Sequence, residues 1–117
     1  MKYSKSTMEP GILVLTMSGR FLMGTDCQQV SGEIDSGILR GDKSFIFDMT
    51  GVDHVDSAAV GQIVKCYSKL KKVGGTLRLA GVAGMVDRVL KMTQVHKVIP
   101  IFPTAADAGK DFPSSKS

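Results

Sequence analysis

The chain has 117 residues, of which 43% are hydrophobic and 22% charged, and it carries a formal net charge of +4 with a pI near 9.2. This composition is typical of one globular domain with a real core, and 6% aromatic residues are too few for a basic RNA-binding surface. The longest apolar run, Ile12–Leu15, is far too short to cross a bilayer, and no signal-peptide core is present. We therefore expect a cytoplasmic protein without membrane insertion and without direct nucleic-acid binding.

The first residues predict a hairpin. Residues 1–8 and the β-branched run Ile12–Ser18 suit two strands, and Glu9-Pro10-Gly11 between them is a turn signal. Residues 19–24 then read as a loop that leads into a helix.

Helical periodicity appears in three longer segments and one short one. The segments are residues 25–39, 57–73, 84–93 and 104–108. In the longer segments apolar residues repeat at intervals of three and four, which predicts one buried face on each helix. The expected inward positions are Val30, Ile34, Ile38, Val60, Ile63, Val64, Tyr67, Leu70, Val86, Val89, Leu90 and Met92. Thr25 or Asp26 should cap the first helix, and Gly74-Gly75 should end the second in a left-handed turn.

Short apolar runs between the helices predict the remaining strands. These are Ser44–Met49, Thr76–Ala80 and Val98–Phe102, the last at a sheet edge because Pro100 has no N–H for a ladder. The order β-β-α-β-α-β-α-β-α indicates an α/β fold with a mostly parallel sheet, an antiparallel N-terminal edge and helices packed on it. We expect one domain over residues 1–109 and a disordered tail over residues 110–117.

Three carboxylates, Asp48, Asp53 and Asp56, fall near one another after the third predicted strand. They could hold Mg²⁺ in a small enzyme, and they resemble the acidic pocket of a phosphate-accepting receiver domain. The receiver interpretation needs an acidic pair after the first strand and a lysine after the last, and the sequence has neither. The simpler interpretation, which we favour, is that Asp53 and Asp56 shape a turn and cap a helix.

The other chemistry-bearing residues lack partners at useful spacing. His54 and His96 have no metal or triad spacing, and Cys27 and Cys66 read as reduced thiols. The sequence contains no hydrolase elbow, dinucleotide fingerprint or Walker loop. We therefore expect no enzymatic activity, cofactor or metal. The second long helix also carries a stripe of lysines, Lys65, Lys69 and Lys72. We expect this stripe to be a solvated helix face and not a contact for an acidic partner.

Ser57 stands where the acidic loop meets the second long helix. A helix start offers unpaired backbone N–H groups and the positive end of the helix dipole, so a hydroxyl there can cap the helix or carry a phosphate. On residue type alone, capping is the first expectation for Ser57 and phosphorylation is the second.

From Ser44 onward the sequence resembles the STAS domain family, whose best-known members are bacterial anti-sigma-factor antagonists. The similar motifs, in the family's order and spacing, are Phe45-Ile46-Phe47-Asp48, Asp56-Ser57-Ala58-Ala59-Val60-Gly61, Gly74–Leu79 and Val89–Thr93. The early segment Leu15–Leu22 also resembles a family strand end. The resemblance implies that Ser57 is the phosphate acceptor of a partner switch. The unphosphorylated protein would bind an anti-sigma factor that is also a serine kinase, phosphorylation would separate the two, and a phosphatase would reset the switch.

The resemblance also implies a docking surface around Ser57. Its expected members are Leu22, Met23, Gly24, Thr25, Asp56, Ser57, Ala58, Val60 and Gly61. Three positions depart from the family pattern, because Leu22 replaces an Asp, Ala58 a Ser or Thr, and Ala59 a Gly. These departures favour the alternative of a STAS scaffold that is not phosphorylated, in a signalling assembly or as a soluble subunit of a membrane transport system.

Overall fold

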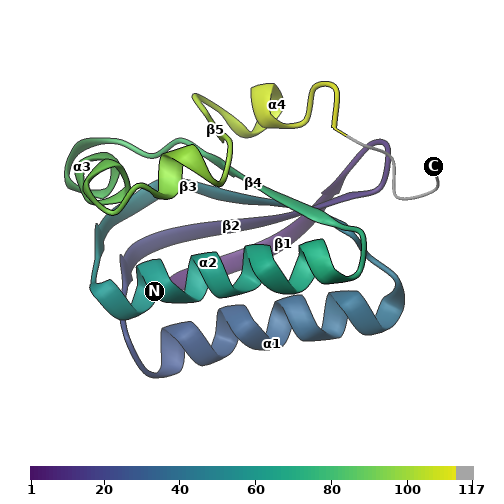
Figure 1. Ribbon diagram of the computed structural model, residues 1–117, viewed down its shortest axis with the longest axis horizontal. Coiled ribbons are helices and arrows are strands. Elements are labelled where there is room, and N and C mark those ends of the chain that lie inside the picture. The colour runs from purple at the N-terminus through teal and green to yellow at the C-terminus, as the bar shows by residue number, and fades with distance from the viewer. Residues whose placement is uncertain (113–117) are drawn as a thin grey trace.

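The computed structural model describes residues 1–112, which form a five-stranded sheet with helices on both faces (Figure 1). The strands lie in chain order: β1 (Lys2–Met8), β2 (Ile12–Phe21), β3 (Ser44–Val55), β4 (Thr76–Ala80) and β5 (Ile101–Phe102). β1 is antiparallel to β2, and every other neighbouring pair is parallel. The predicted α/β architecture with an antiparallel N-terminal edge is confirmed.

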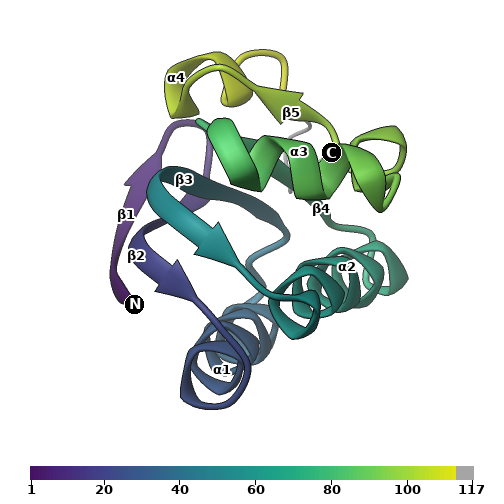
Figure 2. The ribbon, with the colours of Figure 1, turned by 90° about the vertical axis from the view of Figure 1, so that its left-hand side faces the viewer.

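Two long helices, α1 (Thr25–Arg40) and α2 (Ser57–Lys72), lie side by side under one face of the sheet (Figures 1 and 2). After β4 come α3 (Gly84–Met92) and a 3-10 turn (Val95–Lys97), and α4 (Ala105–Ala108) covers part of the opposite face. Because α1 and α2 follow parallel strands, both helices start at the same edge of the sheet. Among the described residues, no helix combines the length and the apolar character needed to cross a membrane.

The main core fills the space between the sheet and helices α1 to α3. It contains residues that alternate along the strands and the inward residues of each helix, such as Leu15, Phe47, Ile34, Ile63 and Leu90, all at most 1% exposed. The other residues of the same strands face the opposite side, where Ile12, Val14 and Ile46 pack with Ala108 and Phe112. These strands are therefore apolar on both faces, which explains why they read as continuous hydrophobic runs.

β2 and β3 extend well past their predicted ends. Their parallel pairing continues to Phe21 and Val55, so residues 19–21 and 50–55, predicted as loops, belong to the sheet. Two register shifts along this pair mark irregularities that admit polar and glycine residues into the strands. Only residues 22–24 then separate β2 from α1. Because Phe21 pairs with Val55, this short loop lies beside the end of β3.

Two helix positions and one strand boundary also differ from prediction. Met92 and Val64, both predicted to face inward, are 80% and 36% exposed, and for Met92 the reason is that α3 ends there. β5 begins at Ile101 instead of Val98, since the 3-10 turn occupies the preceding residues and leaves Val98 exposed. The predicted end of α2 is confirmed, because Gly74 has a φ of 80° and the Gly75 N–H donates to the Leu70 carbonyl at 2.6 Å.

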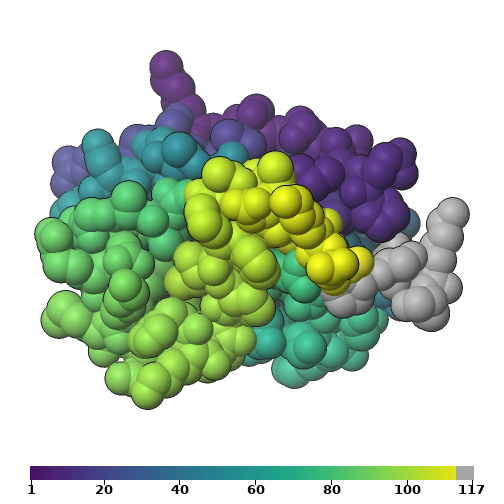
Figure 3. All heavy atoms as spheres, turned by 90° about the horizontal axis from the view of Figure 1, so that it is seen from above, coloured from purple at the N-terminus to yellow at the C-terminus, as the bar shows by residue number. Residues whose placement is uncertain are grey.

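Arg78 on β4 fastens the C-terminal segment to the second face of the sheet. Its Nη1 donates to the carbonyls of Ala108 and Lys110, both at 2.9 Å, and its guanidinium lies 4.4 Å from the centre of the Phe112 ring. Figure 3 looks onto this segment beside the β1–β2 hairpin. The first three residues of the predicted tail are therefore part of the fold, whereas residues 113–117 lie outside the described residues.

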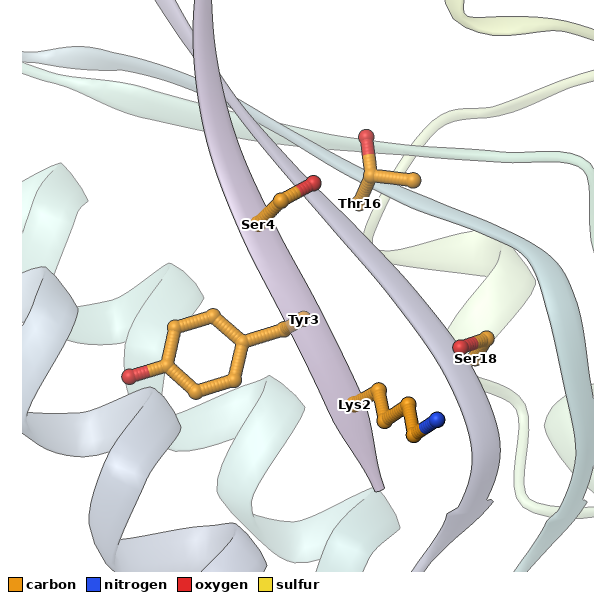
Figure 4. Close-up of a pocket in the computed structure, with 5 residues that line it drawn as sticks. All are labelled: Lys2, Tyr3, Ser4, Thr16 and Ser18. Atoms are coloured by element: carbon orange, nitrogen blue, oxygen red, sulfur yellow. The ribbon is translucent and has the colours of Figure 1, made fainter.

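A shallow pocket of about 200 Å³ lies on the part of this second face that β1 and β2 form (Figure 4). Lys2, Tyr3, Ser4, Thr16 and Ser18 line it. The Tyr3 side chain points the other way from those of Lys2 and Ser4, and its hydroxyl donates to Glu33 Oε2 on α1 at 2.9 Å. Apart from Tyr3, the polar side chains that line it are thus one ammonium and three hydroxyls.

Candidate functional site

The carboxyl ends of β2 and β3 bring the predicted site together. Phe21 and Val55 are register partners, and directly after them the chain enters α1 and α2. Figure 2 looks onto this edge, where both helices begin. Residues 22–25 and 56–61, which are far apart in the sequence, therefore meet at one place on the surface.

Asp56 is the N-cap of α2 and also holds the neighbouring loop. Its Oδ1 accepts from the Ala59 N–H at 2.8 Å, and its Oδ2 accepts from the Met23 N–H at 2.9 Å. These hydrogen bonds lower the pKa of the Asp56 carboxyl, and the bond from the Met23 N–H has the largest effect. An ionised Asp56 thus joins residue 23 to the start of α2.

Ser57 is the first residue of α2 and its side chain is exposed. The expectation that Ser57 caps the helix is wrong, because the Asp56 carboxylate performs that role. Within residues 1–112 the Ser57 hydroxyl has no hydrogen-bond partner. Because it is also exposed, a change at this hydroxyl breaks no bond of the fold. It lies at the positive end of the α2 dipole, where an added anion is stabilised.

The loop between β2 and α1 is held from both ends. The Leu22 N–H donates to Asp26 Oδ2 at 2.9 Å, and Gly24, with a φ of 94° that favours glycine, is the N-cap of α1. Neither Thr25 nor Asp26 caps this helix as predicted, since Asp26 bonds backwards to the loop. Met23 is consequently presented outward with 74% of its surface exposed.

The residues predicted to dock a partner differ in their exposure. Met23, Gly24, Thr25, Ser57 and Gly61 are exposed, and Leu22, Asp56 and Ala58 are half-buried. Val60, which was also predicted to contact a partner, is only 6% exposed and packs in the main core.

Cys27 and Asp26 also hold the loop before α1, a role that was not predicted for either residue. The Cys27 thiol donates to the Leu22 carbonyl at 3.5 Å, and burial, together with the carboxylates of Asp56 and Asp26, raises the pKa of this thiol. The protonated thiol is the form that donates to the carbonyl. The sequence signal for the Asp26 bond is an aspartate four residues after Leu22, close enough for its side chain to accept from the Leu22 N–H.

The acidic residues do not gather into a metal site. Asp48 Oδ1 accepts from the backbone N–H and the hydroxyl of Thr50, at 3.1 and 2.6 Å, and Asp53 is exposed. Over residues 1–112 no group of three or more His, Cys, Asp or Glu side chains is placed to hold a cation. Asp48 and Asp56 organise a turn and a helix start, which agrees with the simpler interpretation for Asp56.

Ser57→Ala is expected to change the free energy of unfolding by no more than about 0.5 kcal/mol, because the side chain is exposed and caps nothing. This is smaller than the loss of about 1 kcal/mol that a capping serine would give. Chemical denaturation of both proteins measures the difference. A loss above about 1 kcal/mol would show that the hydroxyl has a structural role.

Comparisons with known proteins identify relatives along most of the chain. A sequence model described as the STAS domain matches residues 3–108. The anti-sigma F factor antagonist of Paenibacillus polymyxa is 25% identical over 99 residues, which cover 84% of each chain. A relative from Thermotoga neapolitana is 27% identical over 74 residues, and that match spans 66% of its length, slightly less than two thirds.

Solved structures share the fold. The Bacillus cell fate determinant SpoIIAA in its phosphorylated form has a TM-score of 0.73 at 17% identity, with 92% of this chain and 96% of that one covered. A sulfate transporter family protein from Wolinella succinogenes has a TM-score of 0.76 at 21% identity, with 88% and 85% covered. At these identities the likeness shows the fold alone.

Proposed function

Because the chain belongs to the STAS domain family, we propose that it is an anti-sigma-factor antagonist whose partner binding is switched by phosphorylation of Ser57. The proposal rests on the different roles of Asp56 and Ser57 at the start of α2. Asp56 caps the helix, while the exposed Ser57 hydroxyl has no partner among the described residues. The serine is therefore free to change its charge without loss of a structural bond. The relative from Paenibacillus polymyxa, named an anti-sigma F factor antagonist, supports the same function.

A phosphate on Ser57 would be tolerated by the fold. It adds about −1.5 to −2 charge and three acceptor oxygens at the positive end of α2. The first-turn N–H groups that Asp56 leaves free are suitable donors for it. Its repulsion from the ionised Asp56 is screened by water at this exposed position. The free protein therefore keeps its structure in both states.

In a complex the same phosphate would oppose binding. A partner that covers Ser57 removes water from the dianion, and an unpaired buried charge costs several kcal/mol. The proposed partner is an anti-sigma factor with serine kinase activity, which supplies the phosphate from ATP and is then released. A phosphatase would restore the hydroxyl and the binding-competent surface.

Met23 is the apolar anchor of the proposed docking surface. It projects beside Ser57 through the loop that Asp56 holds, and a flexible, polarisable methionine suits a partner pocket. Gly24 and Gly61 flank the surface, and a Cβ at either position would meet no atom within 4 Å, so a partner can approach the backbone there. The proposed docking surface thus consists of the exposed Met23 side chain and of backbone at Gly24 and Gly61 that no side chain covers.

We expect Met23→Ala to weaken binding to the anti-sigma factor by about tenfold or more, because truncating an interface anchor typically costs above 1 kcal/mol. Surface plasmon resonance with immobilised partner measures the change. Met92→Ala is the matched control, since Met92 is 80% exposed on α3. An equal loss in both variants, or none in Met23→Ala, would contradict this role for Met23.

The phosphorylation step is tested by incubation with ATP and the cognate anti-sigma kinase, followed by peptide mass spectrometry. The proposal predicts one phosphate per chain on Ser57 and none in Ser57→Ala. Phosphate on another residue, or none at all, would contradict the switch.

A non-phosphorylated STAS scaffold is the second candidate function. The departures at Leu22, Ala58 and Ala59 favour it, because they lie around the proposed acceptor. The two functions differ in one result. A scaffold retains its partner after incubation with ATP and the kinase, whereas the switch releases it.

A further inference from the structure

The ends of α1 and α2 form a second surface at the pole opposite Ser57. The two helices are joined by an ion pair of 3.0 Å between Lys69 Nζ and Asp35 Oδ1. Leu39 lies one turn beyond Asp35, and Val73 lies one turn beyond Lys69, so both follow the same seam between the helices. Ser57 is at the far end of α2, about 24 Å away by helical rise.

Two apolar side chains are exposed at this pole. Leu39 is 89% exposed, the most exposed of the large hydrophobic residues in the described chain, and Val73 is 38% exposed. An aliphatic residue with nearly all of its surface in water contributes nothing to the core. Leu39 is therefore available for contact with something outside this chain.

Cationic residues flank the two apolar residues along the chain. Lys71 and Lys72 are exposed, and within residues 1–112 neither they nor Lys43 belong to an ion pair. The Lys43 carbonyl accepts from the Thr76 N–H at 2.8 Å, which fixes residue 43 beside the end of α2. Arg40 is paired with Asp42 at 3.2 Å. The helix-end patch, defined as Leu39, Arg40, Lys43, Lys71, Lys72 and Val73, thus has four cations and one nearby carboxylate.

We propose that the helix-end patch docks on an anionic lipid surface, with Leu39 and Val73 in the headgroup region and the lysines over the lipid phosphates. Lysines near such a surface are attracted to it, and an inserted apolar side chain adds the hydrophobic contribution. A second copy of the chain does not fit, because self-docking would place lysines against lysines. This pole is also where α1 and α2 both end; Leu39 there is almost wholly in solvent, whereas Val73 exposes about a third of its surface. A deformable lipid interface can surround an exposed side chain such as Leu39, whereas a protein partner needs a preformed acidic pocket and a larger contact area.

Cosedimentation with vesicles tests this docking. The full chain is mixed at low ionic strength with phosphatidylcholine vesicles that contain about one third phosphatidylglycerol, and with pure phosphatidylcholine vesicles as reference. We expect binding to the anionic vesicles alone, with release at about 0.5 M salt, where charge interactions are screened within a few ångströms.

Matched variants locate the contact. Lys71→Gln with Lys72→Gln should lower partitioning about 25-fold, at about fivefold for each lysine, and Leu39→Gln should lower it about tenfold. The charge-matched control is Arg88→Gln with Lys97→Gln, and the apolar control is Met92→Gln; all three residues are exposed and lie on α3 or the 3-10 turn. The controls should bind like the unaltered chain.

Three results would overturn the proposal. The first is no binding to anionic vesicles at low salt. The second is an equal loss of vesicle binding in the charge-matched control, which would show that the net charge of the chain, and not the helix-end patch, explains the binding. The third is patch-dependent binding of poly-L-glutamate without vesicle binding, which would identify an acidic protein as the partner.

Discussion

Ser57→Asp is expected to weaken binding to the anti-sigma factor by at least about 100-fold while leaving the fold intact. The carboxylate places a permanent charge where the proposed partner covers the start of α2. Leaving such a charge unpaired in an interface costs several kcal/mol, and about 1.4 kcal/mol is tenfold in affinity. Isothermal titration calorimetry of the variant and the unaltered chain measures the ratio.

Ser68→Asp is the matched control for this prediction. Ser68 is also exposed on α2, but it lies three turns further along the helix. It should retain full affinity, so a loss confined to Ser57→Asp identifies position rather than net charge as the cause. Equal affinities for Ser57→Asp and the unaltered chain would show that the partner does not cover this residue.

Asp56→Ala is expected to lower both stability and partner affinity, since one carboxylate caps α2 and fixes the docking loop. Loss of the cap should reduce the melting temperature by roughly 5 °C. Loss of the bond from the Met23 N–H frees residues 22–24, and ordering them again on binding should weaken affinity about tenfold. Circular dichroism melts and calorimetry measure the two effects.

Asp56→Asn separates the two roles of this side chain. Its single amide oxygen can keep the cap to the Ala59 N–H, whereas its amino group cannot accept from the Met23 N–H. Most of the stability should return and the affinity defect should persist. Full recovery of affinity in Asp56→Asn would show that the tether to Met23 does not matter for docking.

The contribution of Asp56 also has a defined pH dependence. Its pKa is lowered in the folded chain, so the native state favours the ionised form. The stabilisation is complete above the ordinary aspartate pKa of about 3.9 and is lost as the pH falls through the lower, folded value. The stability difference between Asp56→Ala and the unaltered chain should therefore shrink in strong acid.

The order of elements could be predicted from the sequence because hydrophobic periodicity directly reflects burial. Val30 and Ile34 on α1, and Ile63 and Leu70 on α2, are buried as their spacing indicates. The ends of β2 and β3 could not be predicted in the same way. Residues 50–55 contain glycine and polar side chains typical of a loop, and they are strand only because residues 18–21 pair with them.

The place of the candidate site at the start of α2 was predictable, but its hydrogen bonds were not. Aspartate and serine are nearly equal as helix caps, so residue type cannot decide which of Asp56 and Ser57 performs that role. The structure decides it through backbone geometry, because Asp56 has an extended conformation and Ser57 is already helical. The bond from Met23 to Asp56 joins residues 33 positions apart, and it follows only from the parallel pairing of β2 with β3.

The most direct measurement is a pair of calorimetric titrations of the anti-sigma factor, one with the unmodified chain and one with the chain phosphorylated on Ser57. We predict tight binding of the unmodified form and at least a 100-fold weaker interaction of the phosphorylated form, with superimposable circular dichroism spectra. Equal affinities would contradict the proposed switch, and a loss of affinity accompanied by unfolding would contradict a surface-charge mechanism.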